Sequence, residues 1–81
     1  MIQVLFFAQV KELVGTGSLA LDEEFSSAED IRQYLAAKGD KWSLALESGK
    51  LLVAINQTIS DLSSPVKDGD EVAFFPPVTG G

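Results

Sequence analysis

The chain of 81 residues contains no cysteine and no histidine. Without cysteine it cannot form a disulfide framework, a cysteine-ligated zinc site or a cysteine nucleophile, and it suits a reducing compartment such as the cytoplasm. The lack of histidine also excludes a Ser-His-Asp triad, a Cys-His pair and an imidazole metal site. We therefore expect neither a metal site nor a self-contained catalytic centre in this chain.

Positive charge and long apolar runs are also scarce. The chain has 6 Lys and Arg against 12 Asp and Glu, a formal net charge of -6, which opposes binding to nucleic acid or to an anionic membrane. The longest apolar stretch near the amino terminus, Val4 to Ala8, is far too short to span a bilayer, and no basic leader precedes it. We expect a cytoplasmic protein that binds neither nucleic acid nor membrane.

Acidic residues gather in two places, and neither has the spacing of a calcium loop. The two groups are Asp22, Glu23 and Glu24, and Asp61, Asp68, Asp70 and Glu71. Runs of charge at the ends of strands and in loops are usually solvated surface. We expect both groups to be solvated.

What the sequence does contain is a pattern of strands around one main helix. Apolar runs predict five strands, Ile2–Phe7, Ser18–Leu21, Lys50–Ile55, Thr58–Ser60 and Glu71–Phe75. The strand Lys50–Ile55 is a continuous apolar run and is expected to be buried on both faces. Helical spacing predicts a short helix over Ala8–Val14, a longer one capped by Ser26 with Glu29 and ended by Gly39, and a helical turn around a core Trp42. Residues 1–75 thus predict one α+β domain, a mixed sheet on one main helix.

The last six residues, 76–81, differ from this domain. Pro76 and Pro77 follow the last strand and favour a stiff, extended exit, and the chain finishes with Gly80 and Gly81. Such an arm reaches at most about 20 Å, enough to place its terminal carboxylate in the cleft of another protein. Because glycine has no Cβ, that cleft can be narrow. We therefore predict that the reactive group is the Gly81 carboxylate.

Two segments resemble a known family. DGDEVAFFPPVTGG, from Asp68 to Gly81, and VLFFAQVKELVG, from Val4 to Gly15, are similar to the end and the beginning of the ubiquitin-like sulfur carriers that form the small subunit of molybdopterin synthase. The resemblance implies a ubiquitin-like β-grasp fold. It also implies a sulfur-donating subunit that is not itself catalytic, since the active site of the synthase lies in the large subunit.

The same resemblance implies the chemistry and the partners. Gly81 would be adenylated by a ubiquitin-activating-like adenylyltransferase, converted to a thiocarboxylate, and inserted into the large subunit, where sulfur passes to cyclic pyranopterin monophosphate for the molybdenum cofactor. Adenylate and thiocarboxylate would be transient covalent states, with no permanently bound cofactor. The synthase would be a heterotetramer of two small and two large subunits. The alternatives are a thiamine-pathway sulfur carrier, a protein modifier joined to lysine through Gly81, and an interaction domain without a reactive end.

Alternation along the strands suggests where the partners bind. Gln3 and Phe7 share one parity of the first strand, and the polar Gln3 marks that face as the less buried one. Phe75 lies at the root of the arm, and Ile59 is an apolar residue in a polar strand. We predict that Phe7, Ile59 and Phe75 form one exposed patch. The remaining partner contacts are expected along the arm, at Pro76, Pro77, Val78, Thr79 and Gly80.

Overall fold

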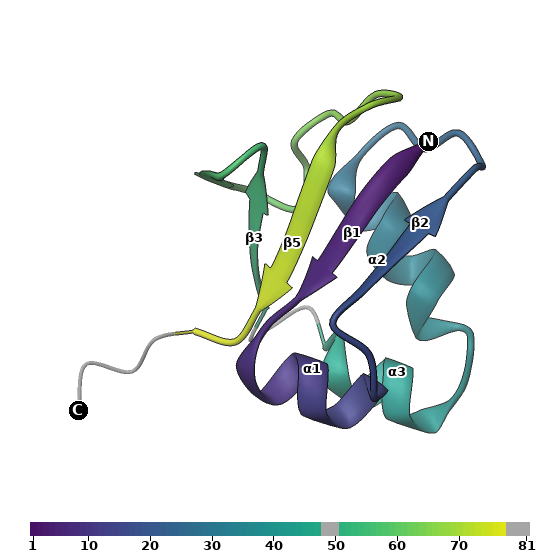
Figure 1. Cartoon of the computed structure of the whole chain (residues 1–81), viewed down its shortest axis with the longest axis vertical. Coiled ribbons are helices and arrows are strands. Elements are labelled where there is room, and N and C mark those ends of the chain that lie inside the picture. Colours follow the sequence, from purple (N-terminus) through teal and green to yellow (C-terminus); the bar gives the residue numbers. More distant parts are fainter. Residues whose placement is uncertain (48–50, 78–81) are drawn as a thin grey trace.

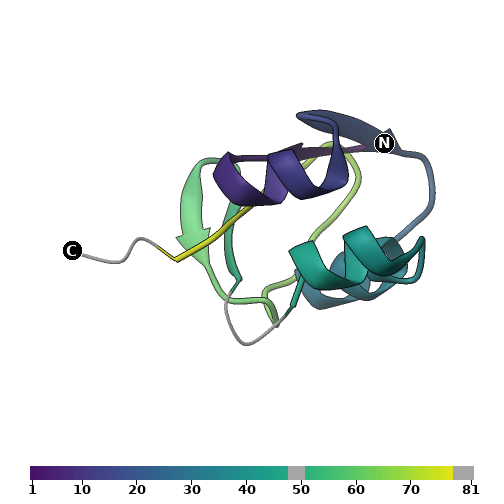
Figure 2. The same ribbon diagram turned by 90° about the horizontal axis from the view of Figure 1, so that it is seen from below.

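The apolar runs of the sequence form the strands of one mixed sheet. The computed structural model describes residues 1–47 and 51–77, and within them the strands are β1 (Ile2–Phe6), β2 (Ser18–Leu21), β3 (Leu52–Ile55), β4 (Thr58–Ser60) and β5 (Glu71–Phe75). The helices are α1 (Ala8–Val14), α2 (Ala28–Ala36) and α3 (Asp40–Ala45). Figures 1 and 2 show the helices on one side of the sheet and at its lower end, which leaves the other face uncovered.

The strand order is β2-β1-β5-β3-β4. The central pair, β1 and β5, runs parallel, and the other neighbours are antiparallel. The sequence predicted a mixed sheet on one main helix, and the structure confirms it. The last strand before the arm therefore lies in the middle of the sheet, between β1 and β3.

Side chains of one parity build the core. Ile2, Val4 and Phe6 of β1 are at most 2% exposed and point to the helices. The Phe6 ring stacks on Phe74 at 6.4 Å between ring centroids and meets Trp42 edge-on at 5.7 Å. Trp42 is half-buried and packs against the core, as expected for a residue that covers one end of it.

Three predicted boundaries were wrong. Phe7 is not the last residue of β1 but the residue that caps α1, because the chain turns sharply at Ala8, whose φ is +53°. Helix α2 stops at Ala36, short of the expected Gly39. Strand β3 begins at Leu52, which is 36% exposed, so it is not buried on both faces: no helix covers its outer side. Lys50 lies outside the described residues.

The cap of α2 is shifted by one residue from the predicted one. Ser27, not Ser26, is the N-cap, and its hydroxyl accepts a hydrogen bond from the Asp30 amide at 3.3 Å. The Asp30 carboxylate accepts from the Ser26 amide in return. Glu29 is left for a different contact, which joins α2 to α3.

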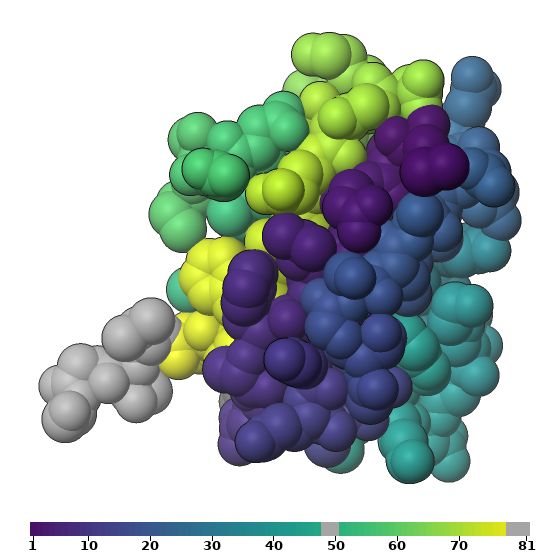
Figure 3. Space-filling model, viewed as in Figure 1, coloured from purple at the N-terminus to yellow at the C-terminus, as the bar shows by residue number. Residues whose placement is uncertain are grey.

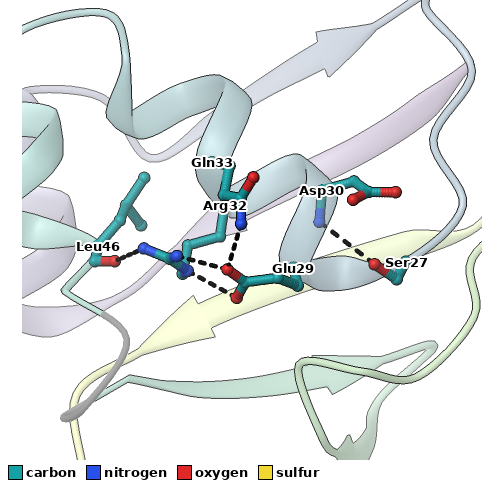
Figure 4. A network of polar contacts seen from close by, with 6 residues as sticks. All are labelled: Ser27, Glu29, Asp30, Arg32, Gln33 and Leu46. Carbon is teal, nitrogen blue, oxygen red and sulfur yellow. Dashed lines mark hydrogen bonds and ion pairs between the residues drawn. The ribbon is translucent and has the colours of Figure 1, made fainter.

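That contact is a network centred on Arg32 (Figure 4). The guanidinium donates to both Glu29 carboxylate oxygens, at 2.8 and 2.5 Å, and to the Leu46 carbonyl at the end of α3, at 2.9 Å. Gln33 also donates to Glu29. The Arg32 hydrogen bond is the main reason why the pKa of Glu29 falls to about 2, with Gln33 lowering it further and burial opposing the change. Ionised Glu29 therefore helps to hold the Arg32 guanidinium in the position from which it donates to Leu46.

This dependence on ionisation gives a first prediction. Because the pKa of Glu29 is lower in the folded chain than its ordinary value of 4.5, its contribution is complete above about pH 4.5 and is lost as pH falls toward about 2. At pH 7 we expect Glu29→Gln to reduce the free energy of unfolding by about 1 to 3 kcal/mol, measured as a denaturant midpoint lower than that of the parent. This difference in free energy should shrink between about pH 4.5 and 2. Glu24→Gln, at an exposed loop residue, is the control at pH 7. A constant difference across this pH range would contradict the assignment.

Candidate functional site

The predicted reactive end lies outside the described residues. Val78, Thr79, Gly80 and Gly81 belong to that part of the chain, so the structure describes the arm only at its root, Pro76 and Pro77. These prolines directly follow β5, and β5 is hydrogen-bonded to a neighbour on each side. The arm therefore starts from a strand held on both edges.

The face of the sheet without helices is apolar around this root. Cross-strand register places Ile59 opposite Ala54, Ala54 opposite Ala73, and Ala73 beside Leu5, so these four residues form a row across one face. Leu52 is the register partner of Phe75 on the same face. We call the surface made by these residues and Phe7 the sheet-face patch; it comprises Leu5, Phe7, Leu52, Ala54, Ile59, Ala73 and Phe75.

Exposure separates Phe7 and Ile59 of this patch from the core. Ile59 is 67% and Phe7 49% exposed, whereas Phe74, one residue before Phe75, is fully buried. Phe7 and Phe75 line the same shallow depression of about 520 Å³ together with Leu5, Ala54 and Ala73. The space-filling view shows β1 and the end of β5 in contact on this face, in purple and yellow (Figure 3). The structure thus brings Phe7, Ile59 and Phe75 to one surface, and their role in binding stays a prediction.

Backbone geometry at two turns sets the positions of the exposed residues Phe7 and Ile59. The left-handed conformation of Ala8 starts α1 immediately after Phe7, whose amide donates to the Phe74 carbonyl at 3.2 Å. Asn56 and Gln57 both have positive φ, +51° and +69°, which is the geometry of a two-residue hairpin turn. That turn returns the chain as β4 and sets Ile59 beside Ala54.

A polar network fixes the hairpin, and it corrects one sequence expectation. Asp70 is 7% exposed rather than solvated: its carboxylate accepts from the Asn56 side chain at 3.0 Å and from the Lys67 amide at 2.9 Å. The hydrogen bond from Asn56, followed by that from Lys67, lowers the pKa of Asp70. Asn56 also accepts from the Glu71 amide. The network ties the β3–β4 turn to the start of β5, and the sequence shows only its separate parts, Asn56 in one turn and Asp-Gly-Asp in another.

The other acidic group lies at the end of the molecule away from the arm. The hydrogen bond that the Tyr34 hydroxyl donates to Glu23, at 2.6 Å, is the main cause that lowers the pKa of Glu23. Within residues 1–47 and 51–77, no three acidic side chains are placed to hold a metal ion. None of the helices in that described part is long and apolar enough to cross a membrane.

Comparisons with known proteins agree with one another. The ThiS family matches residues 4–81. A molybdopterin synthase sulfur carrier subunit from Haemophilus influenzae is 64% identical over 81 residues, which covers the whole of both chains.

Among solved structures, two neighbours inform the fold and the assembly. Small archaeal modifier protein 1 from Methanosarcina acetivorans has a TM-score of 0.76 at 26% identity, covering 99% of this chain and 95% of its own. A complex of subunits 1 and 2 of molybdopterin-converting factor from Helicobacter pylori contains a chain with a TM-score of 0.65 at 28% identity, covering 99% and 97%. The fold is the ubiquitin-like β-grasp, as the sequence resemblance implied.

Proposed function

The chain belongs to the ThiS family, in the group of molybdopterin synthase sulfur carrier subunits, and from this premise we propose that it carries sulfur for a molybdopterin synthase. The observation that supports the proposal most is 64% identity to such a subunit along the entire length of both chains. The aligned length includes the terminal Gly80 and Gly81. The solved complex of a related chain with its second subunit supports a large subunit as partner.

In the proposed reaction the Gly81 carboxylate is first activated. A carboxylate is a poor electrophile, so a ubiquitin-activating-like adenylyltransferase joins it to the AMP part of ATP and releases pyrophosphate. A sulfur nucleophile then attacks the acyl carbon and AMP leaves, which divides one difficult substitution into two easier ones. The product is a terminal thiocarboxylate, a soft and anionic sulfur nucleophile.

The second half takes place in the large subunit. There the thiocarboxylate sulfur bonds to a carbon of cyclic pyranopterin monophosphate in exchange for an oxygen, and water then cleaves the acyl–sulfur bond and restores the Gly81 carboxylate. Each dithiolene requires two deliveries. The proposed assembly is a heterotetramer of two small and two large subunits. This chain contributes the sulfur, the arm that delivers it and a docking surface, and the large subunit contributes the pterin pocket.

The geometry of the described residues suits this division of labour. One arm must enter two different partners, so a docking surface at its root serves both. The sheet-face patch lies there, exposes Phe7 and Ile59, and has no helix over it. Exposed apolar patches of this kind usually mark protein interfaces. We assign Phe7, Ile59 and Phe75 to the contact with both partners, and residues 76–80 to the partner cleft.

Intact-mass spectrometry tests the carrier function directly. Chains purified from cells with active sulfur transfer should include a species about 16 Da heavier than the unmodified chain, because sulfur replaces one carboxylate oxygen. Chains from cells that lack the activating enzyme are the control and should show only the unmodified mass. Conjugates of higher mass without the 16 Da species would instead indicate a protein modifier, the function named for the Methanosarcina acetivorans neighbour.

A further inference from the structure

A groove distinct from the sheet-face patch begins at the same two prolines. It has a volume of about 440 Å³. We call it the arm-root groove; its apolar walls include Leu13 of α1, Leu44 and Ala45 of α3, Leu51, Pro76 and Pro77. Figure 2 shows α1, α3 and the end of the described chain around the lower end of the molecule.

The groove combines an apolar floor with exposed apolar side chains at its mouth. Val10, Ala45 and Leu51 are between 2% and 8% exposed, whereas Leu44 is 62% and Leu13 is 37% exposed. Two exposed leucines next to a preformed apolar hollow are available to pack against a side chain from another protein. In the described residues of this chain, nothing covers Leu44.

We propose that the arm-root groove is a second contact site for the large synthase subunit, which places an apolar side chain between Leu13 and Leu44. This inference rests on the proposed function. Its main support is continuity, because Phe7 of the sheet-face patch is followed by Ala8 of the groove, and Phe75 is followed by Pro76. A subunit that encloses the arm from Pro76 onward is therefore in contact with both surfaces.

Interface size and charge favour the large subunit as the occupant. A lasting assembly of two subunits needs a larger apolar contact than a transient encounter with an activating enzyme, and the related solved complex is one between the two subunits. Glu47 lines the groove and is exposed, so a cationic group of the large subunit beside the root of the arm would complement it.

The test uses adjacent residues of α3 in the full chain. Leu44→Asp places a charge at the mouth of the groove, and Ser43→Asp places the same charge on the same helix at an exposed residue that does not line it. Calorimetric titration with the purified large subunit should show affinity reduced about tenfold or more for Leu44→Asp, and within about twofold of the parent for Ser43→Asp. The melting temperatures of both variants should match that of the parent, because both side chains are exposed.

Two further measurements separate the possible outcomes. Ile59→Asp, in the sheet-face patch, reports on the proposed function: if it loses affinity while Leu44→Asp binds like the parent, the groove inference alone is overturned. If Leu44→Asp instead slows only ATP-pyrophosphate exchange with the activating enzyme, the groove belongs to that enzyme and the proposal is wrong. If the parent chain itself does not bind the large subunit, the proposed function fails, and the groove inference fails with it.

Discussion

Removal of Gly81 is expected to abolish sulfur transfer in a reconstituted synthase assay while the domain melts like the parent. The shortened chain ends in the Gly80 carboxylate, which stops about 3.3 to 3.6 Å short of the position that the partner sites are built for. Misplacement of a reacting group by 1 Å can already reduce a rate about 10²-fold. Among residues 1–47 and 51–77 the last buried core residue is Phe74, so we expect the domain to keep its stability without Gly81.

The assay needs to separate loss of the reactive end from a general defect. A single glycine added before Met1 alters chain length by the same amount at an exposed terminus and should leave transfer intact. A single glycine added after Gly81 should abolish it, since the carboxylate is then displaced in the other direction. Molybdopterin formation by the chain without Gly81 would exclude the carrier mechanism.

The second large effect concerns two neighbouring phenylalanines on opposite faces of β5. Phe74 is fully buried and stacks on Phe6, so Phe74→Ala should cost about 3 to 5 kcal/mol of unfolding free energy. For a domain of this size that lowers the melting temperature by at least about 12 °C. Phe75 lies on the sheet-face patch, so Phe75→Ala should largely keep the fold but weaken binding of the large subunit about 30-fold, or about 2 kcal/mol.

Melting curves and binding titrations on both variants test this contrast. Tyr34→Ala serves as the control, because Tyr34 is an aromatic residue 40% exposed on α2, among the helices rather than on the patch, and its loss should not change the affinity. If Phe75→Ala melted as low as Phe74→Ala, Phe75 would be a core residue. If it bound the large subunit like the parent, the sheet-face patch would not be the docking surface.

Local pattern was sufficient to predict much of this fold. The parity of β1 correctly separated the buried Ile2, Val4 and Phe6 from the exposed Phe7, because alternation along a strand directly reports its two faces. The cap of α2 was misplaced because Ser26 and Ser27 are equally able to cap the helix. Glu29 and Asp30 are likewise equally able to accept the return hydrogen bond from the backbone amide. The choice depends on other contacts: the Ser26 carbonyl accepts from the amide of the distant Val66, and Arg32, three residues along the helix, engages Glu29.

The sequence predicted that Phe7, Ile59 and Phe75 share one exposed surface, and their role in binding stays a prediction. Nothing local shows that Ile59 lies near Phe75, since that proximity requires β3 to pair with both β4 and β5. Long-range pairing is also what buries Asp70 beside Asn56, where composition alone indicated solvated charge. The arm-root groove had no sequence signal, because it forms only where α1, α3 and the residues after β5 meet.

The position of β5 has a mechanical consequence for a carrier that is handed from one partner to another. Tension applied to the arm along its strand is shared by two hydrogen-bonded ladders, one with parallel β1 and one with antiparallel β3. Such a load shears both ladders at once, whereas the same load on an edge strand such as β4 would shear a single ladder. A pull on the arm therefore has to disrupt two strand pairings before β5 leaves the sheet.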